Sequence, residues 1–203
     1  MSQDLVSYAL DIALQSHCEY SEARFHRTND VTCFTRNGEP EPAAISDAEG
    51  IGVRVVYDGA LAFGATNILT KQSMKDLVER LVKNAKYASS VTKEKVHLSE
   101  EETHVQKWSA EEKKNIQDVS VDSMISMLRE LDRTVSNPIS GVAFPNRNLF
   151  LWCNVEEKFY INSDGSRLES RVPRAAYFGL LTSIHDGKPT TISVPPRLCA
   201  ARR

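Results

Sequence analysis

Histidine and carboxylate side chains occur together at one place in the sequence. His97 and His104 flank the stretch Leu98-Ser99-Glu100-Glu101-Glu102-Thr103. Imidazole and carboxylate groups are common ligands of divalent ions such as zinc. The two imidazoles share roughly one face only if this segment is helical, and the HExxH pattern of zinc peptidases is absent. The residues here therefore favour a solvated linker over a metal site.

A second candidate is the glycine pair in Gly50-Ile51-Gly52-Val53-Arg54. A phosphate-binding loop would need a third glycine or the Lys-Ser/Thr of a P-loop, and a helix after it. Here the pattern that follows is a strand, so we expect the glycines to allow a kink or a close backbone approach. Arg54 lies in an otherwise apolar strand, and we expect it to face water or to pair with a carboxylate.

Catalytic constellations of other kinds are not recognisable in the sequence. The chain has five histidines and four cysteines, with no CxxC pair, which predicts scattered, reduced thiols. Trp108 and Trp152 are expected to be core or interface anchors. We therefore predict no catalytic, cofactor-binding or metal-binding residue in this chain.

Composition limits the class of protein further. The 203 residues carry a formal net charge of -2 with a pI near 6.2, which argues against direct nucleic-acid binding. The first residues lack the pattern of a signal peptide, and no apolar run is long enough to span a bilayer. These features predict a cytoplasmic protein that does not contact membranes.

The candidate residues must be positioned by secondary structure, and residues 1–88 are predicted to form an α+β domain. Hydrophobic periodicity predicts one helix before and one after four or five antiparallel strands. Asn37-Gly38 and Asp58-Gly59 are typical tight hairpin turns. The expected helices cover 4–16 and 71–87, and the expected strands cover 20–28, 31–36, 41–46, 51–57 and 61–65.

The rest of the chain repeats this plan. Residues 89–118 read as a charged connecting segment with a short helix at 110–117. Residues 119–203 read as a second helix-plus-strands region, with an aperiodic basic tail from about 193. The fold class is therefore α+β: antiparallel meander sheets with helices on one face, in two helix-plus-strands layers. The helix is expected from Ser120, and the strands at 141–144, 148–155, 158–162, 167–172 and 175–185, with a turn at 186–187.

Several of these segments together resemble the amino-terminal domain of the TldD/PmbA family. The most specific part is the run from Gly50 to Gly59 followed by Phe63-Gly64. The resemblance covers about residues 4–187. It also includes Glu19-Tyr20-Ser21-Glu22-Ala23-Arg24, Arg36-Asn37-Gly38-Glu39 and Phe159-Tyr160-Ile161-Asn162-Ser163-Asp164-Gly165.

The resemblance implies a zinc-dependent peptidase family, also called modulators of DNA gyrase, with cytoplasmic dimers around a protected chamber. Unstructured peptides would be cut at a metal in the carboxy-terminal half of such a protein. The family's metal-binding helix would lie beyond Arg203, so zinc is expected only there and no catalytic residue is carried over. The tail after about Ser193 does not resemble the family's continuation, so we expect a truncated gene, a frameshift or a fragment.

Three functions remain open at this point. The first is the amino-terminal, non-catalytic portion of a TldD/PmbA-like metallopeptidase, inactive alone, which shapes a peptide-access chamber and a dimer interface. Its partner would be a second copy or a family-related chain, and its ligands unstructured peptides. The second is a free-standing peptide-binding module that accepts a strand at the edge near Glu41 to Ser46. The third is an interaction that involves DNA gyrase.

Overall fold

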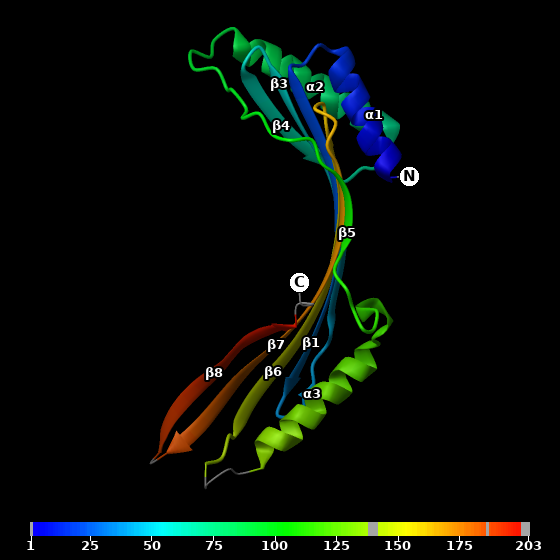
Figure 1. Cartoon of the computed structure of the whole chain (residues 1–203). Helices are drawn as coiled ribbons and strands as arrows, with labels where there is room; N and C mark the ends of the chain where they lie inside the picture. The colour runs from blue at the N-terminus through cyan, green and yellow to red at the C-terminus, as the bar shows by residue number, and fades with distance from the viewer. Residues whose placement is uncertain (1, 138–141, 186, 200–203) are drawn as a thin grey trace. The chain divides into compact units, whose positions relative to one another are not determined.

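The computed structural model describes residues 2–137, 142–185 and 187–199. Eight strands form one sheet in the order β4-β3-β1-β6-β7-β5, with β2 paired to β1 and β8 paired to β7 (Figure 1). The expected α+β fold class is confirmed. The elements in chain order are α1 (Ser2–Gln15), β1 (Tyr20–Arg36), β2 (Glu39–Pro40), β3 (Ala44–Tyr57), β4 (Ala60–Thr66), α2 (Lys71–Ser89), β5 (Val105–Ser109), the 3-10 helix η1 (Ile116–Asp118), α3 (Val121–Ser136), β6 (Asn146–Asn162), β7 (Arg167–His185) and β8 (Lys188–Cys199).

The chain forms two compact units built from interleaved segments. The first unit contains residues 1–27, 48–109 and 156–171, and the second contains residues 28–47, 110–155 and 172–203. Four strands, β1, β3, β6 and β7, therefore have residues in both units. The division at residues 88 and 118 expected from the sequence stays a prediction about domain boundaries.

The first unit packs α1 and α2 on one face of its strands. Along β1 the buried side chains alternate, as period-two burial of one sheet face requires. Gly64 lets α2 approach β4 closely, because a Cβ at this position would lie 3.0 Å from Leu77 and 3.1 Å from Leu81. The core of this unit includes Leu5, Val6, Ala9, Ala13, Ala23, Phe25, Val53, Val55, Met74, Leu77, Val78, Leu81, Phe159 and Ile161.

The second unit packs α3 on its own strands. The helix starts where it was expected, and Ser120 is its N-cap, with a hydroxyl that accepts a hydrogen bond from the Ser123 amide. A buried ion pair ties the helix to β6, because the Arg147 Nε lies 2.8 Å from a carboxylate oxygen of Asp132. The core of this unit contains Cys33, Met124, Leu128, Leu149 and Leu181.

Four strands are longer than the sequence predicts. A break was expected between 20–28 and 31–36, yet β1 runs unbroken from Tyr20 to Arg36. The polar residue Asp30 remains in the strand because its carboxylate accepts hydrogen bonds of 3.0 Å from Trp152 Nε1 and Asn154 Nδ2 on β6. In the same way β3, β6 and β7 each replace two shorter expected strands. β3 begins at Ala44 and continues to Tyr57, without the break that was expected between 41–46 and 51–57. Cross-strand partners that are remote in sequence therefore overrode the local pattern.

The prediction that the chain lacks regular structure from about residue 193 is wrong for the described residues up to Cys199. β8 extends to Cys199 and pairs antiparallel with β7, with a register shift between Tyr177 and Gly179. Prolines are tolerated at strand edges and at bulges, so Pro195 and Pro196 do not prevent this pairing. The partner strand supplies the backbone template that the tail sequence does not encode by itself.

The segment expected to be a linker carries more structure than its sequence indicates. β5 lies within it and pairs parallel with Arg167–Arg171 of β7, which adds a parallel pairing to the expected antiparallel sheet. The short helix expected at 110–117 is instead the 3-10 turn η1. Residues 91–104 before β5 have no helix or strand.

The two tight turns of the first half form as predicted. Asn37 and Gly38 have φ values of 52° and 81°, and Asp58 and Gly59 have values of 42° and 70°. Such left-handed pairs match the twist of the strands that they join. The strand expected at 141–144 begins outside the described residues, as does Asp186 of the expected turn at 186–187.

Candidate functional site

A polar cleft of the first unit lies over the strand face opposite α1 and α2. Alternation places Ser21, Val53 and Val55 in the core, so Tyr20, Glu22 and Arg54 point to the other face. The cavity volume is about 370 Å³. Its lining consists of Tyr20, Glu22, Arg54, Leu98, Ser99, Glu101, Glu102, His104, Tyr160, Asn162, Asp164, Ser166 and Leu168.

A hydrogen-bonded cluster forms the floor of this cleft. The hydroxyls of Tyr20 and Tyr160 lie 3.0 Å apart, and they donate to one oxygen of Glu22 at 2.8 and 3.2 Å. The other Glu22 oxygen lies 3.4 Å from the Arg54 guanidinium. Arg54 therefore pairs with a carboxylate, which is one of the two arrangements expected for it.

The protonation of the floor follows from its burial. Desolvation raises the pKa of the Tyr20 phenol strongly, and its hydrogen bonds with Tyr160 and Glu22 raise it further. Desolvation also raises the pKa of Tyr160, with a further contribution from the Glu22 charge. A raised pKa keeps each phenol neutral and able to donate at neutral pH. The floor is suited to orienting a ligand rather than to acting as a nucleophile or base.

Residues 97–104, which we call the strap, form the other wall. The Thr103 hydroxyl donates to the Asp164 carbonyl at 2.9 Å, and the His104 amide donates to the Ser166 hydroxyl at 3.1 Å. The His104 carbonyl accepts from the Arg167 amide at 2.8 Å. These bonds attach the carboxyl end of the strap to the turn between β6 and β7.

The two histidines singled out in the sequence line neighbouring cavities. His104 lines the cleft, and His97 lines an adjoining cavity of about 360 Å³. Within the described residues no three His, Cys, Asp or Glu side chains are placed to hold a metal ion. The residues present in that part of the chain therefore do not fit a zinc centre.

The glycines of the Gly50–Arg54 run have the structural role that was expected. A Cβ on Gly50 would lie 3.1 Å from the Thr66 carbonyl oxygen. A Cβ on Gly52 would lie 3.3 Å from the Phe63 ring of β4. Both positions allow close approach by the neighbouring strand, which larger side chains would hinder.

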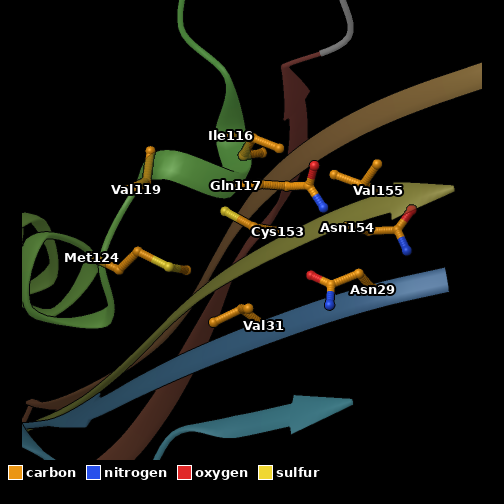
Figure 2. A pocket seen from close by; sticks show the side chains of 9 residues that line it. All are labelled: Asn29, Val31, Ile116, Gln117, Val119, Met124, Cys153, Asn154 and Val155. Atoms are coloured by element: carbon orange, nitrogen blue, oxygen red, sulfur yellow. The ribbon is translucent and has the colours of Figure 1, made fainter. Parts of the chain in front are cut away.

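A much smaller pocket lies in the second unit, between η1, α3 and the strands β1 and β6 (Figure 2). Its volume is about 60 Å³, which is room for a few water molecules. Met124 and Cys153 line it beside the side-chain amides of Asn29, Gln117 and Asn154 (Figure 2). Burial raises the pKa of the Cys153 thiol, so it is not an activated nucleophile.

Cysteines and tryptophans behave largely as local structure requires. Cys18, Cys33 and Cys153 are free thiols, as predicted. Trp152 donates to Asp30 and is partly buried. Trp108 on β5 is 47% exposed and is therefore not a core residue of this chain.

The floor residues Tyr20, Glu22 and Tyr160 were missed as site residues in the sequence. Tyr20 and Glu22 alternate with core residues, which indicated their shared face but not its partners. Tyr160 lies 140 residues from Tyr20 in the chain, and only the pairing of β1 with β6 brings the two together. The cleft could be predicted only if the pairing of β1 with β6 were already known.

No helix among the described residues has the length and apolar character needed to cross a membrane.

Comparison with known proteins identifies two domains in order. Residues 21–85 match the model described as PmbA/TldA metallopeptidase domain 1, and residues 114–191 match the PmbA/TldA metallopeptidase central domain. A metalloprotease of Methanocaldococcus jannaschii is 19% identical over 161 residues, which cover 79% of this chain and 35% of that protein.

Solved structures share the fold at low sequence identity. A proposed modulator of DNA gyrase from Bacteroides thetaiotaomicron matches with a TM-score of 0.72 at 11% identity, over 94% of this chain and 43% of that one. Another, from Thermotoga maritima, matches with a TM-score of 0.70 at 16% identity, over 99% and 44%. TldE from Thermococcus kodakarensis has a TM-score of 0.61 at 13% identity, over 97% and 42%.

This chain spans less than half the length of each of these relatives. The two family matches lie in the same order as the domain names, first and central, and together cover most of the chain. The chain belongs to the PmbA/TldD metallopeptidase family.

Proposed function

We propose that this chain acts as the amino-terminal, non-catalytic portion of a PmbA/TldD-type metallopeptidase in the cytoplasm. In this role it shapes the access of unstructured peptides to a chamber and contributes to an interface with a second copy or a related chain. The observation that carries the proposal is the match to domain 1 and the central domain in sequence order. The polar cleft adds a surface with donors and acceptors of the kind that a peptide requires.

Zinc analysis combined with a peptide assay on the purified chain tests this role. We expect less than stoichiometric zinc, no cleavage of a labelled unstructured peptide, and saturable binding of that peptide. Sedimentation should show self-association, or association with a family-related chain when one is added. Stoichiometric, tightly bound zinc together with cleavage would contradict the non-catalytic role, and absence of any peptide binding would contradict the access role.

A free-standing peptide-binding module is the second candidate. β4 pairs with residues Ile51–Tyr57 of β3. In the described part of the chain this pairing does not extend to Ala44–Gly50, the first residues of β3. Residues 44–49 are exposed, and Ile45 is 66% exposed. An unpaired strand edge can accept an extended peptide by strand addition. Replacing Ile45 with proline should abolish peptide binding under this hypothesis and leave it unchanged if the cleft binds the peptide.

A role that involves DNA gyrase rests on the descriptions of two structural relatives. The acidic pI gives no support for direct DNA contact. A pull-down with purified gyrase subunits distinguishes this role, because neither peptide hypothesis predicts capture.

A further inference from the structure

We infer that the cleft in the first unit recognises a basic side chain, lysine or arginine, of an extended peptide. The inference rests on the proposed peptide-access role and names the ligand chemistry of that site. It depends on three properties of the cleft: its continuity with the adjoining cavity, its charge, and the mixture of apolar and aromatic groups in its lining.

The cleft and the adjoining cavity form a continuous lining. Both are bounded by Tyr20, Leu98, Ser99, Glu101 and Asp164. Each has a volume of about 360–370 Å³, within the range of ordinary ligand sites. Together they offer room for a side chain and for the peptide backbone on either side of it.

Carboxylates dominate the charge of this lining. Within the described residues the lining contains one arginine, Arg54, and its positive charge is already paired with the Glu22 carboxylate. Glu19 is also engaged, because its carboxylate accepts from the Gly59 amide at 3.1 Å. The lining carboxylates belong to Glu19, Glu22, Glu100, Glu101, Glu102 and Asp164.

The strap carboxylates remain available to a ligand. Glu101 and Glu102 are exposed, and in the part of the chain that the structure describes neither has an ion-pair partner. Clefts lined by one sign of charge concentrate the field and raise the local concentration of the opposite charge. An anionic ligand would meet the same carboxylates with its own charge, so the cleft disfavours it.

Apolar and aromatic groups complete the fit to a long basic side chain. Leu98 and Leu168 offer apolar surface along which the methylene stem of lysine or arginine can lie. Tyr20 and Tyr160 line the same cavity, and aromatic rings attract cations through their faces. Because both phenols are hydrogen-bonded to Glu22, these rings are held in place before a ligand arrives. A simple metal-binding acidic patch would not need this combination.

Fluorescence anisotropy with two matched peptides tests the inference on the full chain. The probes are labelled, unstructured Gly/Ser peptides of equal length, one with arginine at two positions and one with glutamine there. We expect the arginine peptide to bind roughly tenfold more tightly at low salt, with the difference shrinking as salt is added.

Two matched variants locate the effect. Glu101→Gln with Glu102→Gln should remove most of the preference for arginine. Glu79→Gln with Glu94→Gln changes the net charge equally at exposed positions outside the cleft and should leave the preference intact. All four positions are exposed, so both variants are expected to fold.

The outcomes separate this inference from the proposed function. Equal affinity for both peptides would overturn the basic-side-chain inference and leave the peptide-access role standing. Binding of neither peptide would overturn both. A preference for arginine that falls equally in the two variants would reflect net charge alone and would also overturn the cleft assignment.

Discussion

Glu22 and Asp132 show how differently two carboxylates of one chain are used. Glu22 accepts from two phenols and faces a guanidinium at the floor of an open cleft. Asp132 is 5% exposed and receives two hydrogen bonds from Arg147, to Oδ1 at 2.8 Å and Oδ2 at 3.0 Å. The first arrangement lies at the open floor of a cleft that a ligand can reach, whereas the second is buried and holds α3 against β6.

The half-buried phenols of the floor predict a loss of stability in alkali. Because the pKa of Tyr20 is raised above its ordinary value of 10.0, the folded chain keeps a proton that the unfolded chain releases. The free energy of unfolding should therefore fall as the pH rises above about 10. Tyr20→Phe should make this fall shallower in denaturant titrations at alkaline pH. An identical slope in the variant would contradict the cluster geometry.

The ion pair of Asp132 with Arg147 predicts a large effect on stability. Asp132→Asn leaves a largely buried guanidinium without its charge partner, which should lower the free energy of unfolding by about 3–5 kcal/mol. Denaturant unfolding measures this loss. Glu79→Gln removes one partner of the exposed pair with Lys75 and should cost less than about 0.5 kcal/mol. Comparable losses in both variants would contradict the assignment.

The helices show which element properties depend on local sequence. Thr70 and Ser120 are N-caps, and each hydroxyl accepts from the amide three residues later. The apolar stripe of α2 faces the core from Met74 to Ala85. Both features can be read from spacing alone, because a helix contains its own hydrogen-bond partners.

Loss of a cap predicts a modest change. Thr70→Ala removes the acceptor for the Ser73 amide and should lower the free energy of unfolding by about 1 kcal/mol. Thr70→Ser keeps the oxygen and should remain close to wild type. Thermal unfolding of the three proteins, followed by circular dichroism, measures both effects, and equal values for alanine and serine would contradict the cap.

Packing of α2 predicts a larger change. Leu77 is 2% exposed and meets β4 at Gly64, so Leu77→Ala should lower the free energy of unfolding by about 2–5 kcal/mol. Lys83→Ala on the exposed face of the same helix is the control and should change stability little. Denaturant unfolding of both variants provides the comparison, and a loss in Lys83→Ala equal to that in Leu77→Ala would contradict the core position.

At the scale of the whole molecule, the units are linked by the strands that they share. β1, β3, β6 and β7 each contribute residues to both units, although each unit has its own hydrophobic core. Unfolding one core therefore removes hydrogen-bond partners from strands that continue into the other. This arrangement favours cooperative behaviour over independent domains.

We accordingly predict a single unfolding transition. Leu77→Ala in the first core and Leu128→Ala in the second should each shift one common denaturant midpoint. Hydrogen exchange resolved by peptide should show that amides of both units lose protection together. Two separated transitions, each moved by only one of the variants, would contradict the prediction.

The sequence by itself determined the α-helices, the tight turns and the fold class. It also indicated a family on local motifs such as the run from Gly50 to Gly59, which the family matches bear out. These features depend on neighbours within a few residues, so spacing and residue type suffice to predict them. The structural role of Gly50 and Gly52 was expected from the strand pattern around them. For Arg54 the sequence left exposure and pairing open, and its partner Glu22 lies on another strand.

The tertiary structure alone decided the strand lengths, the fate of the tail and the cleft. Asp30 stays within β1 because β6 supplies its donors, and β8 forms because β7 offers a template. The cleft unites Tyr20, Tyr160 and the strap through pairings between segments far apart in the chain. Such contacts depend on which strands become neighbours, and local residue spacing does not contain that information.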